Sequence, residues 1–477
     1  MGYNELEKHL HYKKQYREYD LYWGIGIEEE TYMQFSKPVQ VAVPILQGSH
    51  NHERYSVKYF SNYKPFYKDA LISLFPDTSG CIPLPLFLNA HAFNKMDISG
   101  NHKTTYEKVP KVNPRFTGKT FFESLKEYKP RIPICNILTL CNIPKSFISI
   151  FESSCTFDGD SIEFITQDFY KNRVCYVLQE LISTKYELLE CINNFLREKN
   201  VHKEKGFLMY PQINPGFTIM YTNPSNVAMF NNGTYHINIT LPSLLGKNDK
   251  NGVPVLLHPT IFMKEHRRFI RYIQWLEPFI IAVYGTKDPL SVVSDMYTKS
   301  SQRCAISRYI GIGTYDTNLM LTGKILTNPV CEIRGSKNDF WWYNVYHKTS
   351  GYLPLEELGM DINYKKHYNH GVEIRFLDWF PETKLQELIS FFINLADASL
   401  EIESEPDEAI MNKVWNGFVV SMLQNGPEYK ISDEIISIYS KLLCIPLHSD
   451  SIHNVFICIQ NQLKKKYKNS LCARYML

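Results

Sequence analysis

The sequence contains no long hydrophobic run, no paired cysteine motif and no apolar leader at its charged start. Its most apolar stretches, such as 279–284 and 417–423, are far shorter than the roughly 20 residues that cross a bilayer. The eleven cysteines include no C-x-x-C pair, and most lie in apolar runs, which is typical of buried thiols in a reducing compartment. These absences predict a cytoplasmic protein with no membrane partner.

The sequence also lacks a strong excess of either charge, because its 52 Lys and Arg residues nearly balance its 49 Asp and Glu residues, for a net charge of +3. This balance argues against nucleic acid as a partner. With 477 residues and a hydrophobic content of 44%, the chain can bury a large core. No internal repeat and no low-complexity linker divides it. One compact unit with a helical C-terminal portion is therefore the simplest organisation.

The alternation of apolar and polar residues predicts strands in the first third of the chain. We expect a strand at 22–35, with 39–46 and 54–60 able to pair with it as a meander, and a long ordered loop over a site at 75–133. Further extended segments are expected at 216–221, 233–241, 309–313, 341–346 and 371–376.

Helical periodicity occurs within 164–200 and again over 264–284, where Pro278 should kink or end the helix. After Pro381 the pattern is almost wholly helical, with helices expected at 383–400, 406–423, 432–443 and 451–468. Strands from distant segments surrounded by helices indicate the α+β class.

The first group of chemically capable residues is the carboxylate pair Glu28 and Glu30 in a predicted strand. Side chains at i and i+2 of a strand share a face, so both carboxylates point the same way. They repel one another unless a cation lies between them, and oxygen ligands favour Mg²⁺ or Mn²⁺. The alternative is an ordinary solvated acidic strand edge.

The second and third groups also lie on predicted strands. Alternation places His236, Asn238 and Thr240 on one face of 233–241, where they could ligate a metal or contact phosphate or could simply face water. Glu373 and Arg375 share a face of 371–376, and they offer either a metal-ligating carboxylate beside a phosphate-binding guanidinium or a common salt bridge. None of the three strands decides the matter alone.

Together, the order and residue choice of these strands resemble the glutamine synthetase-like carboxylate-amine ligases, the superfamily of glutamate-cysteine ligases and amidoligases. In that superfamily a Gly-x-Glu-x-Glu strand, a later His-x-[His/Asn] strand and a late Glu-x-Arg strand line one funnel. Residues 271–279 also resemble the Trp-Leu-Glu-Pro helix of glutamate-cysteine ligase relatives. The resemblance covers about residues 24–378 and is closest to the amidoligase-type proteins of large DNA viruses.

The resemblance implies a curved, mainly antiparallel sheet forming a glutamine synthetase-like catalytic domain at 1–400, with a helical portion at 401–477. It implies that Glu28, Glu30 and Glu373 are metal ligands and that His236 is a ligand or a phosphate contact. The implied catalytic residues are Arg375, which would stabilise the transferred γ-phosphoryl group, and Glu30. Asn238, which stands where many relatives have a second His, would help seat the nucleotide.

The implied activity is an ATP- and Mg²⁺-dependent ligation, with Mn²⁺ as an alternative ion. A carboxylate is a poor acyl donor, so joining it to an amine requires a leaving group, which ATP supplies through an acyl phosphate. The substrates would be a small-molecule or peptide carboxylate, with glutamate the first to test, and an amine. The resemblance also allows a homo-oligomer. The alternatives are a guanido-type phosphotransferase of related fold and a catalytically inactive binding scaffold.

Four further residues are candidates for nucleotide binding. They are Thr240, on the face of His236, and the arginines Arg303, Arg308 and Arg334. Each arginine could bind phosphate or a substrate carboxylate, but a surface or packing role is at least as common.

Overall fold

The computed structural model describes residues 21–42, 81–84, 87–88, 132–133, 155–158, 161–166, 171–212, 233–248, 250, 254–287, 299–301, 362–364, 371–402, 404–409 and 412–477. Among these residues, no helix combines the length and the apolar character that crossing a bilayer requires.

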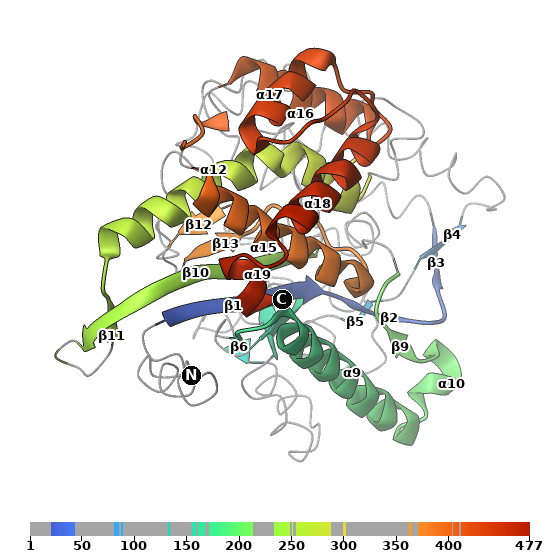
Figure 1. Cartoon of the computed structure of the whole chain (residues 1–477). Helices are drawn as coiled ribbons and strands as arrows, with labels where there is room; N and C mark the ends of the chain where they lie inside the picture. Colours follow the sequence, from blue (N-terminus) through green and yellow to red (C-terminus); the bar gives the residue numbers. More distant parts are fainter. Residues whose placement is uncertain are drawn as a thin grey trace, which may run out of the picture.

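An antiparallel sheet forms the centre of the described residues, with eight strands drawn from distant parts of the chain (Figure 1). Three adjacent strands lie at its middle: β1 (Leu21–Thr31), β10 (Thr234–Asn248) and β13 (Val372–Ile374). The remaining strands are β12 (Ile362–Tyr364) beyond β13, β11 (Pro254–Leu256) against β10, and β8 (Ser161–Ile165), β7 (Cys155–Asp158) and β6 (Ile132–Pro133) beyond β1. The predicted α+β class with a mainly antiparallel sheet is confirmed.

Two smaller sheets correct the predicted meander. β2 (Met33–Phe35) pairs with β5 (Phe87–Leu88) and β9 (Leu208–Met209), while β3 (Val39–Ala42) pairs with β4 (Cys81–Leu84) and not with β1. The reason is that the chain bends after β2, where the backbone N–H groups of Ser36 and Lys37 donate to Phe207 and Lys205. The segment predicted as one long loop, 75–133, also contains β4, β5 and β6. The segments expected to be extended at 54–60, 216–221, 309–313 and 341–346 lie outside the described residues.

The helices largely follow the predicted pattern, with one start wrong, because the helix expected at 406–423 begins only at Lys413. They are α9 (Val174–Glu198), α10 (Val201–Lys205), α12 (Pro259–Tyr284), α15 (Leu385–Glu401), α16 (Lys413–Asn425), α17 (Asp433–Leu443), α18 (Ile452–Tyr467) and α19 (Leu471–Met476). Polar N-cap side chains begin three of the C-terminal helices, because Asn412, Ser432 and Ser451 each accept a hydrogen bond from the backbone three residues on. The helical periodicity predicted within 164–200 is confirmed as α9, which begins at Val174, while Phe164 belongs to β8.

Pro278 neither ends α12 nor divides it, which corrects the expected break. A proline inside a helix removes the N–H that would bond the carbonyl four residues earlier, here that of Gln274, and disturbs the turn around it. Here the carbonyl of Trp275 accepts hydrogen bonds from Trp415 Nε1 at 3.2 Å and from the Tyr439 hydroxyl at 2.5 Å. Side chains of α16 and α17 thus supply donors where the proline weakens the helix.

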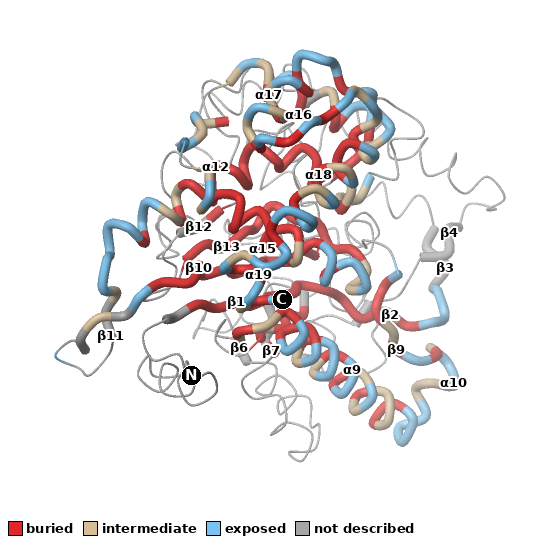
Figure 2. The backbone as a smooth tube through the Cα atoms, in the orientation of Figure 1, coloured by how far each residue is buried: buried red, intermediate tan, exposed pale blue. Residues whose placement is uncertain are grey.

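One face of the main sheet is apolar and packs against helices. Trp23, Ile25 and Ile27 alternate on this face of β1 and are buried (Figure 2). Trp23 contacts the ring of Tyr475 in α19, with centroids 4.8 Å apart. The opposite face of β1 carries the carboxylates of Glu28 and Glu30, and both residues are buried as well. The core therefore lies on the helix side, and the polar side of the same strands holds the candidate site.

Candidate metal centre

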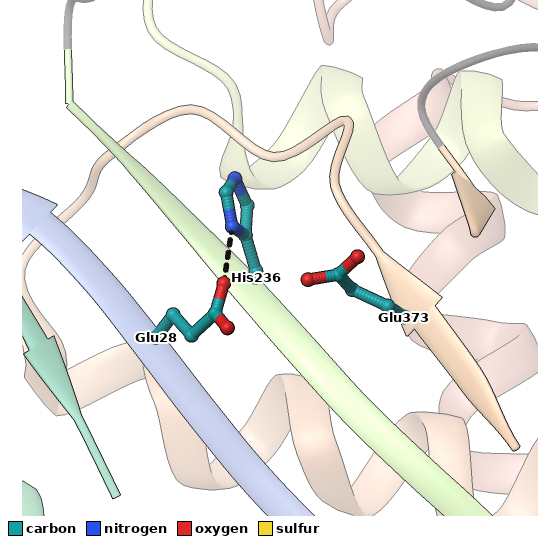
Figure 3. A group of neighbouring side chains, drawn as sticks. All are labelled: Glu28, His236 and Glu373. Carbon is teal, nitrogen blue, oxygen red and sulfur yellow. Dashed lines mark hydrogen bonds and ion pairs between the residues drawn. The ribbon is translucent and has the colours of Figure 1, made fainter. Parts of the chain in front are cut away.

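The strand register brings the three predicted groups together on one face of the sheet. Glu28 of β1 lies opposite His236 of β10, and Asn238 of β10 lies opposite Glu373 of β13. The side chains of Glu28, His236 and Glu373 point toward one another from three neighbouring strands (Figure 3). Pairing of segments more than 130 residues apart in sequence thus assembles the site.

Direct contacts link these side chains. His236 Nδ1 lies 2.8 Å from Glu28 Oε2, and His236 Nε2 lies 3.8 Å from Glu30 Oε1. Arg375 Nη1 donates to Glu373 Oε1 at 3.2 Å and lies 3.4 Å from His236 Nδ1. The guanidinium therefore borders both the imidazole and the third carboxylate.

The imidazole of His236 is held in its neutral form. Burial lowers its pKa from 6.5 to about 3, and the positive charge of Arg375 acts in the same direction, while Glu28 opposes both. A neutral imidazole has a lone pair on one ring nitrogen, which is what a metal ligand needs. His236 is therefore available as a ligand at any ordinary pH.

A fourth carboxylate, Glu163, belongs to the same face and was missed by the sequence interpretation. Glu163 lies opposite Glu30 in the pairing of β1 with β8, and it is fully buried. The Thr166 hydroxyl fixes this register by accepting from the Ile27 N–H at 2.8 Å. The available signal was the alternation of 161–165, in which Ile162 and Phe164 are apolar and Glu163 lies between them.

The donor set fits divalent cations at two adjacent positions. Glu28, His236 and Glu373 each offer one ligand atom, and these atoms lie within 4.8 Å of one another. The same holds for Glu30, Glu163 and His236. Because Nδ1 faces Glu28 and Nε2 faces Glu30, the two groups lie on opposite sides of one ring. Carboxylate oxygens and an imidazole nitrogen are common ligands of divalent cations.

Comparison with known proteins shows that the chain is similar to a viral protein. Over 469 residues it is 37% identical to an uncharacterized protein of Acanthamoeba polyphaga mimivirus, and the match covers 98% of this chain and 78% of the relative. The chain belongs to the family of that protein. No protein-family model and no solved structure matches the chain.

The two polar candidates next to His236 on β10 differ in their surroundings. Asn238 is fully buried, and within the described part of the chain neither atom of its amide group has a hydrogen-bond partner. Thr240 Oγ1 accepts from the Gly371 N–H at 3.1 Å, so its hydroxyl already joins β10 to the start of β13. Asn238 is therefore the better placed of the two to contact a ligand. The predicted binders Arg303, Arg308 and Arg334 lie outside the described residues.

Proposed function

We propose that this protein is an ATP- and Mg²⁺-dependent carboxylate-amine ligase, with its active site on the polar face of β1, β10 and β13. The observation that carries the proposal is the convergence of Glu28, His236 and Glu373 beside Arg375. These residues also match, in kind and order, the three strands of the glutamine synthetase-like ligases that the sequence resembles. We also propose that these three strands line a funnel of the glutamine synthetase-like kind.

Each residue of the polar face has a defined task in such a reaction. Glu28 and Glu373 would hold one cation and Glu30 and Glu163 another, and neutral His236 would ligate one of the two through the ring nitrogen that carries its lone pair. Bound there, the cations would offset the negative charge of the ATP phosphates and align the γ-phosphoryl group.

Arg375 and Asn238 act on the substrates directly. The Arg375 guanidinium, which is nearly buried, offsets negative charge that develops on the transferred phosphoryl oxygens. The Asn238 amide offers one acceptor and two donor hydrogens to the nucleotide or to the reacting carboxylate. His236 stays neutral, because burial lowers its pKa to about 3.

The overall reaction has two steps. A substrate carboxylate oxygen attacks the γ-phosphorus of ATP, forming an acyl phosphate and releasing ADP. The amine nitrogen then attacks the acyl carbon, the bond to the phosphate oxygen breaks, and the products are an amide, orthophosphate and a proton. We propose a small-molecule or peptide carboxylate as the first substrate, with glutamate the first to test.

The test is ADP release in the presence of Mg²⁺, measured with pools of carboxylates and amines. Glu30→Ala and Arg375→Ala are each expected to lower the rate about a hundredfold or more, the scale seen when a preorganised electrostatic group is removed. Glu405→Ala, which removes the carboxylate of an ion pair with Arg267 in the C-terminal portion, is the control and should retain the wild-type rate.

Three outcomes would contradict parts of this proposal. Turnover that survives both substitutions would reject the site. A stable phosphorylated product formed without any amine would favour a guanido-type phosphotransferase. The absence of metal-dependent ATP binding would favour a binding scaffold.

A further inference from the structure

A second buried charged cluster lies behind the candidate metal centre, on the opposite face of the sheet. Glu29 stands between Glu28 and Glu30 in β1, and the alternation of a strand points its side chain the other way. Its carboxylate is fully buried and accepts hydrogen bonds from Lys185 Nζ at 2.7 Å and from Trp379 Nε1 at 2.9 Å. Lys185, in α9, is also fully buried.

The cluster continues from Lys185 to the helical region. Lys185 Nζ donates to Glu382 Oε2 at 2.5 Å, and the Tyr186 hydroxyl donates to the other oxygen of Glu382 at 2.7 Å. Burial alone would raise the pKa of Glu382, but the ammonium of Lys185 and its hydrogen bond bring the pKa below its ordinary value. The ammonium of Lys185 is thus held between two carboxylates from different elements.

Trp379 extends the cluster to all three strands of the site. It follows Arg375 by four residues, and its backbone N–H donates to the carbonyl of Gly233, the residue before β10. Gly233 has a φ of 81°, and a Cβ atom there would lie 3.0 Å from the Glu30 carbonyl oxygen and 3.1 Å from Trp379 Cβ. The chain segments therefore meet closely at the backbone of Glu30.

Stability alone does not require this arrangement. Replacing a buried ion pair by apolar residues of similar volume is often neutral or stabilising, because desolvation of the charges offsets their attraction. An apolar residue at position 29 would also continue the alternation of Trp23, Ile25 and Ile27 on this face. What the charged cluster adds is a defined position for Glu29. Two hydrogen bonds to its carboxylate, from Lys185 and Trp379, fix where the residue lies in the sheet.

We propose that Glu29, Lys185 and Trp379 are positioning residues of the metal centre, which hold the Glu28 and Glu30 carboxylates in place from behind the sheet. This inference rests on the metal site of the proposed function. Glu28 and Glu30 are the direct neighbours of Glu29, so a displacement of its peptide groups moves both carboxylates. The Lys185 anchor thereby controls the ligand geometry without touching the cation.

The experiment measures Mn²⁺ affinity and the electron paramagnetic resonance spectrum of bound Mn²⁺, using the full chain without substrates. Lys185→Met is expected to weaken Mn²⁺ binding about ten- to a hundredfold, the range seen when groups that orient metal ligands are lost, and to change the spectrum. Trp379→Phe keeps an aromatic ring but removes one donor to Glu29, so we expect a smaller loss of affinity.

Arg271→Met is the matched control, because it also removes a buried cation from a carboxylate. Arg271 of α12 donates to Glu408 at 2.8 Å, among the helices. The control is expected to lower the free energy of unfolding and to leave Mn²⁺ affinity and spectrum as in the wild type.

The outcomes separate this inference from the proposed function. If the wild type binds Mn²⁺ and a folded Lys185→Met variant binds it equally well, the positioning role is rejected while the metal site stands. Should Lys185→Met not fold, unchanged Mn²⁺ binding by Trp379→Phe has the same meaning. A wild type that binds no Mn²⁺ rejects the metal site and this inference with it.

Discussion

The neutral ring of His236 couples the candidate site to the pH dependence of folding. Its pKa falls from 6.5 to about 3 on folding, chiefly through burial and then through the charge of Arg375. Between these two values the unfolded chain binds a proton at His236 that the folded protein does not bind. The stability that depends on this residue is therefore complete above pH 6.5 and is lost as the pH falls toward 3.

We expect this coupling to be visible when the metal-free wild type is compared with His236→Asn. Below pH 6.5, the free energy of unfolding of the wild type should fall with pH more steeply than that of the variant, by up to about 1.4 kcal/mol per pH unit. Urea unfolding in the presence of a chelator at a series of pH values measures both slopes. Parallel slopes would mean that His236 titrates normally in the folded protein.

The residues of the site differ in how far the sequence could predict their positions. Glu28, Glu30, His236, Glu373 and Arg375 could be assigned to strand faces because alternation at i and i+2 is a local property. Glu163 could not, because its place depends on β8 pairing with β1, and local alternation does not specify which strand is the neighbour. The contacts of Glu29 could not be predicted either, since its partner Lys185 lies in a helix 156 residues away.

At the scale of elements, the C-terminal helix α19 depends on one buried acidic side chain. Asp397 of α15 accepts from the backbone N–H groups of Cys472 at 2.7 Å and Ala473 at 2.8 Å, at the start of α19. These groups lack partners within the helix, and a carboxylate there also interacts favourably with the helix dipole. Asp397 thus joins α19 to the helix that packs beneath it.

Replacing Asp397 by Asn should lower the free energy of unfolding by about 1–3 kcal/mol, because one backbone N–H group then faces the side-chain NH₂ group, which cannot accept a hydrogen bond. Urea unfolding measures the loss, and hydrogen exchange of 471–477 should show that α19 opens first. Asp450→Asn is the matched control, since Asp450 accepts from the Ser451 N–H at the exposed start of α18 and should contribute less. An equal loss in both variants would contradict the role of burial.

The helices and strands show where local sequence patterns no longer suffice to predict the structure. The helices after Pro381 were predictable because their apolar periodicity and N-cap residues are local features. The continuity of α12 through Pro278 was not, because the donors that meet the Trp275 carbonyl come from α16 and α17. The pairing of β3 with β4 was missed for the same reason, since its partner follows about forty residues later.

At the scale of the whole molecule, the helical portion after residue 400 is joined to the rest by buried contacts. Trp275 Nε1 of α12 donates to the Asp407 carbonyl at 2.8 Å, and Arg271 pairs with Glu408. Trp415 Nε1 of α16 and the Tyr439 hydroxyl of α17 also donate to the carbonyl of Trp275, at 3.2 and 2.5 Å. These contacts indicate that the sheet and the C-terminal helices unfold together, although the division at residue 400 stays a prediction.

Cation binding provides a test of this unity, because a ligand that binds only the folded state stabilises everything that unfolds with its site. At a free Mn²⁺ concentration of about a hundred times the dissociation constant, we expect the free energy of unfolding to rise by about 2.7 kcal/mol. Hydrogen exchange should show this gain equally for the slowest amides of β1 and of α17 and α18. The double variant Glu28→Gln, Glu163→Gln, which removes one carboxylate from each ligand group, should lose the gain in all of these segments. Protection that rises in β1 and stays unchanged in α17 and α18 would show instead that the helical portion unfolds independently of the sheet.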